Sequence, residues 1–347
     1  MEEASSNQEN SPEKNAIDNI PKENLKKSKR IDRFPILILC LLVLSLAFNV
    51  FLVLRMNHGS ISGASFYLIK SPNENFIDSN VQNQGAILHY VSLKPIIEQE
   101  IRNYDTEENV GIFVQDIKTG SWLGINEKKG FFPASLLKIT IMMAILKKVQ
   151  NEELKLTDEI ILTEKDLDER AGDLYRKGTG AKVSISQLLE AMITFSDNTA
   201  MNALKRQLSF YEYDSIFVHV GIPNPYVEYK EEVSSGVTPR GMIRIFKSLY
   251  FSTFLLPSFS EMALDLTTDT QEEELIPRGV PSEIQVAHKF GMSIVEGEEV
   301  LHDCGIVYHP KNPYFICVMT KDLELEKSKE LIYKISKDVF DFVESSS

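Results

Sequence analysis

The segment from Phe34 to Leu54 constrains the architecture of this chain most, because its 21 residues carry no charge. An apolar helix of that length is long enough to cross the hydrocarbon core of a bilayer. Five basic residues lie between positions 26 and 33, whereas only Arg55 follows the run closely. The positive-inside rule therefore predicts a single-pass protein of the cell membrane, with a cytoplasmic N-terminus and an extracellular main domain.

A cleaved signal peptide is the alternative interpretation of the same run. Ser62 and Ala64 resemble the small residues of a cleavage site, but the run and its charged leader are longer than is typical. The polar composition before the run predicts disorder, and the Gly- and Asn-rich stretch after it predicts a tether. We therefore expect four parts: a disordered cytoplasmic tail (1–33), a transmembrane helix (34–54), an extracellular tether (55–85) and one folded domain (86–347).

The chain beyond the run is acidic, since residues 56–347 contain 29 Lys and Arg against 43 Asp and Glu. Nucleic-acid binding needs a basic face, so we expect no nucleic acid as partner. No C-x-x-C pair and no histidine spacing indicates a metal site, and we expect no metal and no cofactor. We expect Cys304 and Cys317 on neighbouring strands, and whether they form a disulfide stays open.

The order of predicted elements indicates an α+β fold. Apolar periodicity and turn residues predict a helix over 93–104, strands over 110–116 and 121–125, helices over 135–149, 186–208 and 238–250, strands over 285–289, 303–308 and 314–320, and a helix over 326–343. The strands come from both ends of the domain. This order predicts an antiparallel sheet flanked by helices, with an inserted all-helical subdomain.

Ser135 and Lys138 form an S-x-x-K pattern at the start of a predicted helix, where they lie one turn apart on the same face. A serine hydroxyl needs a base, and a buried lysine that loses its proton can supply one. The helix N-terminus also directs N–H groups towards Ser135, which suits an oxyanion. The pattern alone is weak, because Ser11 and Lys14 repeat it in the tail and a serine at a helix start is usually an N-cap.

Two further polar groups follow in the predicted domain. The tripeptide Ser-Asp-Asn at 196–198 interrupts an apolar helical stretch, and Lys-Phe-Gly at 289–291 ends a predicted strand. A break between two helices is the simplest interpretation of the first group. A surface charge followed by a turn is the simplest interpretation of the second.

Together the three groups resemble the S-x-x-K, S-D-N and K-T-G motifs of the serine β-lactamase and penicillin-binding-protein superfamily. The order matches, and the resemblance covers about residues 95–345. Phe-Pro-Ala before Ser135, Val-Thr-Pro at 237–239 and the segment 302–307 resemble the class A branch. The resemblance implies a β-lactamase/transpeptidase-like fold and a membrane-anchored serine hydrolase that forms an acyl-enzyme with β-lactams or related amides.

The resemblance also implies a catalytic role for four residues. Ser135 would be acylated, and Lys138 would be its base or part of a proton relay. Ser196 would pass a proton to the leaving nitrogen. Lys289 would attract the substrate carboxylate and tune Ser196.

Four more residues are implied to bind substrate. Asn198 would hold the substrate and Lys138 in place. The N–H groups of Ser135 and Met292 would form the oxyanion hole, beside Gly291. Ser293 would supply a hydroxyl that the third motif lacks, because Phe290 stands where the family has Thr or Ser to help bind the substrate carboxylate.

The second departure concerns hydrolysis of the acyl-enzyme. Class A enzymes have an E-x-x-L-N segment whose Glu activates water, and residues 223–236 contain no such segment. Acidic loop residues are usually only solvated. The candidates for this base are Glu228, Glu231 and Glu232.

Three functions therefore stay open. The first is a class A β-lactamase type hydrolase. The second is a D-alanyl-D-alanine carboxypeptidase/transpeptidase-like penicillin-binding protein acting on peptidoglycan stem peptides. The third is a non-catalytic cell-wall binding protein, which the intact motif residues argue against. His302, beside Asp303, is interpreted as orienting a strand near the site, and the sequence does not indicate the oligomeric state.

Overall fold

The computed structural model describes residues 90–104, 107–225 and 236–346. The chain divides into two compact units, 1–64 and 65–347, and every described residue belongs to the second unit. Each statement below concerns that unit.

The predicted membrane helix (34–54), its tail (1–33) and the tether (55–85) lie outside the described residues. Within the ranges that the structure describes, no helix has the length and apolar character needed to cross a membrane. Membrane anchoring therefore stays a prediction.

The described part combines strands and helices in the order that the sequence predicts, with several additions. The strands are β1 (Val110–Asp116), β2 (Trp122–Ile125), β3 (Glu159–Ile161), β4 (Lys182–Ser184), β5 (Val286–Val295), β6 (Glu298–Val307) and β7 (Tyr314–Lys321). The α-helices are α2 (Lys94–Arg102), α3 (Lys138–Gln150), α4 (Ile185–Thr194), α5 (Asn198–Lys205), α6 (Phe210–Val220), α7 (Pro239–Tyr250), α8 (Pro257–Thr268) and α9 (Leu325–Ser345). Short 3-10 helices are η1 (Ala134–Leu137), η2 (Glu164–Asp166), η3 (Leu174–Lys177) and η4 (Pro277–Gly279).

The main sheet is antiparallel and has the strand order β2-β1-β7-β6-β5. Strands from both ends of the domain meet where β1 pairs with β7, with Val110 opposite Thr320. The α+β fold with an antiparallel sheet flanked by helices is thus confirmed.

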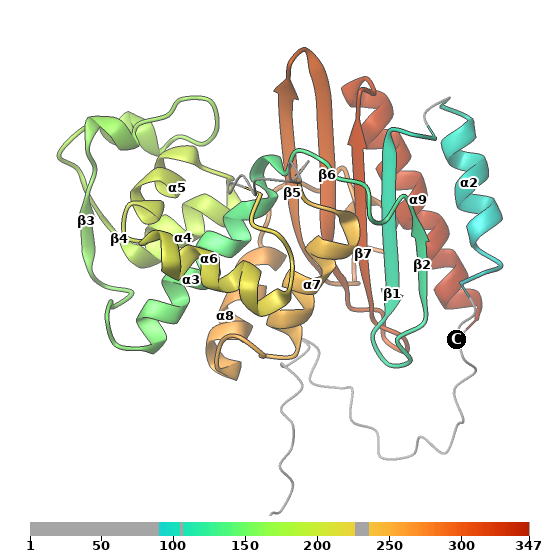
Figure 1. Ribbon diagram of the computed structural model, residues 1–347, viewed down its shortest axis with the longest axis horizontal. Helices are drawn as coiled ribbons and strands as arrows, with labels where there is room; N and C mark the ends of the chain where they lie inside the picture. Colours follow the sequence, from blue (N-terminus) through green and yellow to red (C-terminus); the bar gives the residue numbers. More distant parts are fainter. Residues whose placement is uncertain (1–89, 105–106, 226–235, 347) are drawn as a thin grey trace, which may run out of the picture. The chain divides into compact units, whose positions relative to one another are not determined.

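The sheet separates two apolar cores, as the alternation along β7 shows. Ile316 and Val318 face the core that includes α2 and α9, whereas Cys317 and Met319 face the core of the inserted helices. Because successive side chains of a strand point to opposite faces, β7 is buried on both sides. Figure 1 shows α2 and α9 together beyond one side of the sheet and α3 to α6 on the other.

The insertion between β2 and β5 is not all-helical, which corrects the sequence prediction. β3 pairs with β4 through three residues each, with Ile160 opposite Val183. Strands of three residues are too short to display the alternating pattern by which a strand is recognised in sequence. The predicted helix over 186–208 is also two helices, because α4 ends at Thr194 and α5 begins at Asn198, with Ser196 at φ 54° between them.

Two strands near the C-terminus are longer than predicted. β5 runs on to Val295 and β6 starts at Glu298, so the two form a hairpin whose turn residues Glu296 and Gly297 both have positive φ. We expected β5 to stop before Gly291, because glycine after a charged residue usually indicates a turn. Gly291 instead lies inside the strand.

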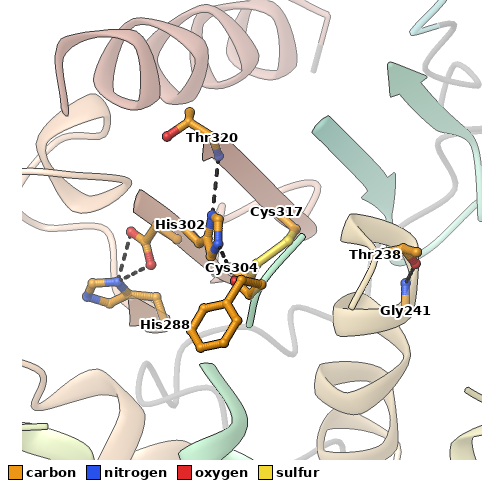
Figure 2. Close-up of a disulfide and its surroundings, with 9 residues drawn as sticks. Thr238, Gly241, His288, His302, Cys304, Cys317 and Thr320 are labelled. Atoms are coloured by element: carbon orange, nitrogen blue, oxygen red, sulfur yellow. Dashed lines mark hydrogen bonds and ion pairs between the residues drawn. A yellow bond between two sulfur atoms is a disulfide. The ribbon is translucent and has the colours of Figure 1, made fainter. Parts of the chain in front are cut away.

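Cys304 and Cys317 face each other on neighbouring strands, which confirms their predicted placement. They are joined by a disulfide, the point that the sequence left open (Figure 2).

Candidate active site

The turn that holds Ser135 precedes α3. Ser135 lies half-buried in η1, and α3 begins at Lys138. The N-cap residue of α3 is Leu137, and no side chain caps this helix end. Ser135 is therefore not the cap of α3. Ala134 has φ 45°, a conformation that costs a non-glycine residue about 1–3 kcal/mol. The fold therefore maintains an unfavourable backbone conformation directly before this serine.

Lys138 connects the first motif to the second. Its side chain is almost fully buried, at 2% exposure. The Nζ group donates to the backbone oxygen of Ser196, to Ser196 Oγ at 3.1 Å and to Asn198 Oδ1 at 2.8 Å. The S-x-x-K lysine and the S-D-N tripeptide, 58 to 60 residues apart in sequence, are thus one polar group.

Opposing effects act on the charge of Lys138. Burial lowers its pKa to about 8, while the negative charges of Asp197 and Asp168 raise it. Three oxygen acceptors favour the ammonium form, and the scarcity of water favours the neutral amine. A lysine with a pKa near 8 has a substantial neutral fraction at mildly alkaline pH and can then accept a proton.

The junction between α4 and α5 fixes the second motif. Asp197 accepts hydrogen bonds from the backbone N–H of Ala200 and from that of Leu174, each at 2.8 Å. The first contact caps α5, and the second holds η3 against the site. The simple interpretation of this tripeptide as a helix break is therefore correct, and the same break places Ser196 and Asn198 on Lys138.

Asp168 is a site residue that the sequence did not indicate. It accepts a hydrogen bond from Asn198 Nδ2 at 3.3 Å, and its hydrogen bonds with Arg170 lower its pKa to about 2. The charged carboxylate fixes the amide of Asn198, so that Oδ1 faces Lys138. A single Asp in a loop 30 residues from its partner leaves no pattern by which sequence could find it.

The third motif presents its lysine differently from expectation. Lys289 is fully buried, and its Nζ donates to the backbone oxygen of Phe290 at 3.2 Å and lies 4.2 Å from the centre of the Phe290 ring. Burial and, to a smaller extent, the positive charge of Lys138 lower the pKa of Lys289 to about 7. The ammonium is thus shielded from solvent, whereas the predicted role was to attract a carboxylate.

Gly291 lies where β5 passes the nucleophile turn. A Cβ atom at this position would lie 3.1 Å from both the Ser135 nitrogen and the Pro133 oxygen. A side chain at this position would therefore push the turn of Ser135 away by a few tenths of an ångström. The next residues along β5 are Met292, which is exposed, and Ser293, which is half-buried. The approach brings the two predicted oxyanion-hole residues, Ser135 and Met292, into one region.

His302 supports the same turn from inside the sheet (Figure 2). It is fully buried and pairs across the strands with Gly291. Its Nε2 is 2.8 Å from the Phe132 oxygen, and its Nδ1 is 3.2 Å from the Thr320 backbone nitrogen. Burial lowers the pKa of His302 to about 4, so the ring is neutral, with Nε2–H donating to Phe132 and Nδ1 accepting from Thr320. We interpreted His302 as orienting a strand, and the structure adds a contact to the turn.

The candidate deacylation bases Glu228, Glu231 and Glu232 lie outside the described residues. Among the residues that are described, no three or more His, Cys, Asp or Glu side chains are grouped so as to hold a metal ion. The structure thus brings together Lys138, Ser196 and Asn198, and places Gly291 against Ser135. The individual roles of these residues stay predictions.

Comparison with known proteins agrees with this fold. A family model described as the beta-lactamase enzyme family matches residues 92–343. Beta-lactamase ROB-1 of Haemophilus influenzae is 24% identical over 287 residues, which covers 78% of this chain and 92% of that protein. PBP-A, a solved structure, is 23% identical with a TM-score of 0.65, covering 73% of this chain and 97% of that one. A mutant of PBP-A, described as an acyl-enzyme complex with penicillin G, is 24% identical with a TM-score of 0.64, over 73% and 97% of the two chains.

Proposed function

Because the chain belongs to the β-lactamase enzyme family and is an enzyme of the serine hydrolase type, we propose that it forms an acyl-enzyme on Ser135 with β-lactams or related amides. The observation that supports this most is the buried contact of Lys138 with Ser196 and Asn198. That contact gives a serine one turn away a base whose pKa lies near working pH.

The proposed acylation uses these groups in sequence. Neutral Lys138 takes the hydroxyl proton of Ser135 as Oγ forms a bond to the carbonyl carbon. The resulting oxyanion accepts hydrogen bonds from the N–H groups of Ser135 and Met292. The carbon–nitrogen bond then breaks. Ser196 gives its proton to the leaving nitrogen and is reprotonated by Lys138, 3.1 Å away, which restores the neutral amine.

The fate of the acyl-enzyme distinguishes the two types of enzyme that could form it. The class A β-lactamase type needs a base that activates water. A D-alanyl-D-alanine carboxypeptidase/transpeptidase type is favoured by one observation, the absence of an E-x-x-L-N segment from residues 223–236. We propose that water attacks the acyl-enzyme slowly, and that peptidoglycan stem peptides are a second substrate class.

Membrane anchoring belongs to the same proposal. The uncharged run at 34–54 and its basic flank support a single-pass protein with the catalytic domain outside the cell. Both β-lactams and cell-wall peptides are found there. If the proposal holds, alkaline carbonate will not extract the full-length protein from membranes, and external protease will digest the domain in intact spheroplasts. Release by carbonate would contradict anchoring.

The test of acylation uses a fluorescent penicillin and the full-length protein, with Ser135→Ala as control. We expect a labelled band in the wild type that fades over hours and no band in the variant. Fading within seconds would show efficient hydrolysis and favour the β-lactamase type. Absence of a band from the wild type at millimolar probe would contradict acylation by β-lactams and favour the non-catalytic alternative.

A further inference from the structure

A cavity of about 580 Å³ opens beside the reactive groups. Two of its lining residues come from within the motifs themselves. Asp197 lies between Ser196 and Asn198, and Phe290 lies next to Gly291, whose backbone contacts the Ser135 turn. A substrate attached to Ser135 therefore has this cavity next to it. The inference drawn from the cavity rests on the proposed acylation of Ser135.

Hydrogen bonds fix the segments that form the cavity. Each of them joins a lining segment to a helix end or to the sheet. They are Leu174 N–H to Asp197 at 2.8 Å, Gln271 N–H to the Thr194 oxygen at 3.3 Å, Thr270 Oγ1 to the His288 oxygen at 3.1 Å, and Ile276 N–H to Asp303 at 3.0 Å. Asp303 is itself held by His288 Nδ1 at 2.8 Å, within the sheet. The cavity is therefore largely formed before any ligand arrives.

The walls of the cavity combine aromatic rings with carboxylates. Phe195, which is 48% exposed, and Phe290 are its aromatic residues. Its acidic residues are Asp173, Asp197 and Glu272, and Lys177 is the one basic residue among the described lining residues. Asp197 is buried and accepts two backbone N–H groups, and Asp173 pairs with Arg176 at 3.1 Å, so Glu272 carries most of the negative charge that a ligand would meet. Aromatic faces and carboxylates attract cations and repel anions.

The burial of Lys289 strengthens this preference. Its ammonium lies against the Phe290 ring and is not exposed, so it offers a ligand in the cavity no ion pair. A carboxylate placed there would lose hydration and would lie in the same cavity as the carboxylate of Glu272. A neutral or cationic group would meet no such cost.

We propose that this cavity binds the part of the substrate on the leaving-nitrogen side, and that it selects a neutral or cationic group there over a carboxylate. The substrate class is then an amide or β-lactam whose acidic group is masked, as an ester or amide, or is replaced by an amine. Phe290 and Glu272 set the preference.

Three forms of one β-lactam test the selection. Benzylpenicillin, its methyl ester and its 2-(diethylamino)ethyl ester share the acyl group and the ring. They differ at the carboxylate, which is anionic in the first, masked by a small neutral group in the second and masked by a larger cationic group in the third. The full-length protein is mixed with each, and the rate of Ser135 acylation is followed by intact-protein mass spectrometry, which also reports whether the ester survives. We expect the cationic ester to react fastest and the free acid slowest, with about a tenfold span.

Two variants and a control assign the preference to the cavity. Glu272→Gln should lower the ratio of the acylation rate with the cationic ester to that with the methyl ester by about threefold. Glu273→Gln is the matched control, since Glu273 is exposed and is not among the residues that line the cavity. Phe290→Thr should raise the rate of acylation by the free acid about threefold relative to that by the methyl ester.

The outcomes separate the inference from the proposed function. Fastest acylation by the free acid, or equal effects of Glu272→Gln and Glu273→Gln, would overturn the selection and leave acylation of Ser135 intact. Failure of all three compounds to acylate the wild type would overturn the proposed function and, with it, this inference.

Discussion

The two sides of the site are built differently. On the helical side, side chains from the start of α3 and the α4–α5 junction make a connected polar group, with Lys138 bonded to Ser196 and Asn198. On the strand side, β5 contributes mainly backbone, through the close approach of Gly291 to Ser135, and covers its lysine with Phe290. The helical side keeps the groups that proton transfer needs. The strand side departs from the family pattern at Phe290, where the substrate would be recognised. The groups for chemistry and those for recognition therefore lie on different sides of the site.

The largest expected effect is on the helical side. Lys138→Met should slow acylation by fluorescent penicillin about a thousandfold, because the base is lost. Lys148→Met is the matched control, since Lys148 pairs at the surface with Glu212 and should leave the rate unchanged. A loss smaller than tenfold in Lys138→Met would mean that another group takes the proton.

A pH series sharpens the same point. The lowered pKa of Lys138, about 8, means that its neutral form increases as pH rises through 8. The rate constant for acylation should therefore rise about tenfold from pH 7 to pH 9. Stopped-flow labelling would measure it. A profile that is flat over this range would show that the neutral amine is not the base.

His302 tests the support of the nucleophile turn from the strand side. His302→Asn shortens the side chain, so that it no longer bridges Phe132 and Thr320, and should slow acylation about tenfold with a loss of about 1–3 kcal/mol in unfolding free energy. His309→Asn removes another buried imidazole, one that contacts Glu344 far from the turn. Equal slowing in both variants at equal stability would reduce His302 to a purely structural residue.

The disulfide should give the smallest effect on chemistry. It closes a segment of 13 residues between β6 and β7, so Cys317→Ala should lower the free energy of unfolding by about 3 kcal/mol. Acylation at 25 °C should stay within about twofold of wild type, because neither cysteine contacts the polar group around Lys138. Urea unfolding and labelling rates would be compared on the same preparation. Acylation tenfold slower than in the wild type would contradict this expectation and show that the disulfide between β6 and β7 affects the reactive groups.

The same division explains how much the sequence could predict. The two halves of the polar group on the helical side are visible as local patterns, namely a lysine one turn after a serine and a break inside an apolar helix. Their contact across 58 to 60 residues was implied only by the family resemblance. The strand side depends on contacts between distant segments. Gly291 was interpreted as a turn because a close approach to Pro133 and Ser135 has no sequence signature. His302 and Asp168 act through partners 170 and 30 residues away.

Short or local features also escaped prediction, for a different reason. β3 and β4 are too short to show a period. α6 does begin with a capping box, formed by Ser209 and Glu212, and that signal was available in the sequence. The membrane helix at 34–54 stays a prediction, as does the role of the acidic residues between 226 and 235 as a deacylation base, since both segments lie outside the described residues.

The pairing of β1 with β7 also governs how the chain reaches this fold. Val110 and Thr320 lie opposite each other, although 210 positions separate them. During synthesis β1 and β2 emerge early, yet the edge of β1 that β7 will occupy stays unpaired until almost the whole chain is made. Closing so long a loop is slow, and an open strand edge invites aggregation. A nascent chain of this protein therefore has a long interval in which a chaperone can bind it. Loss of the last 23 residues would remove α9 and uncover the face of β7 that carries Ile316 and Val318.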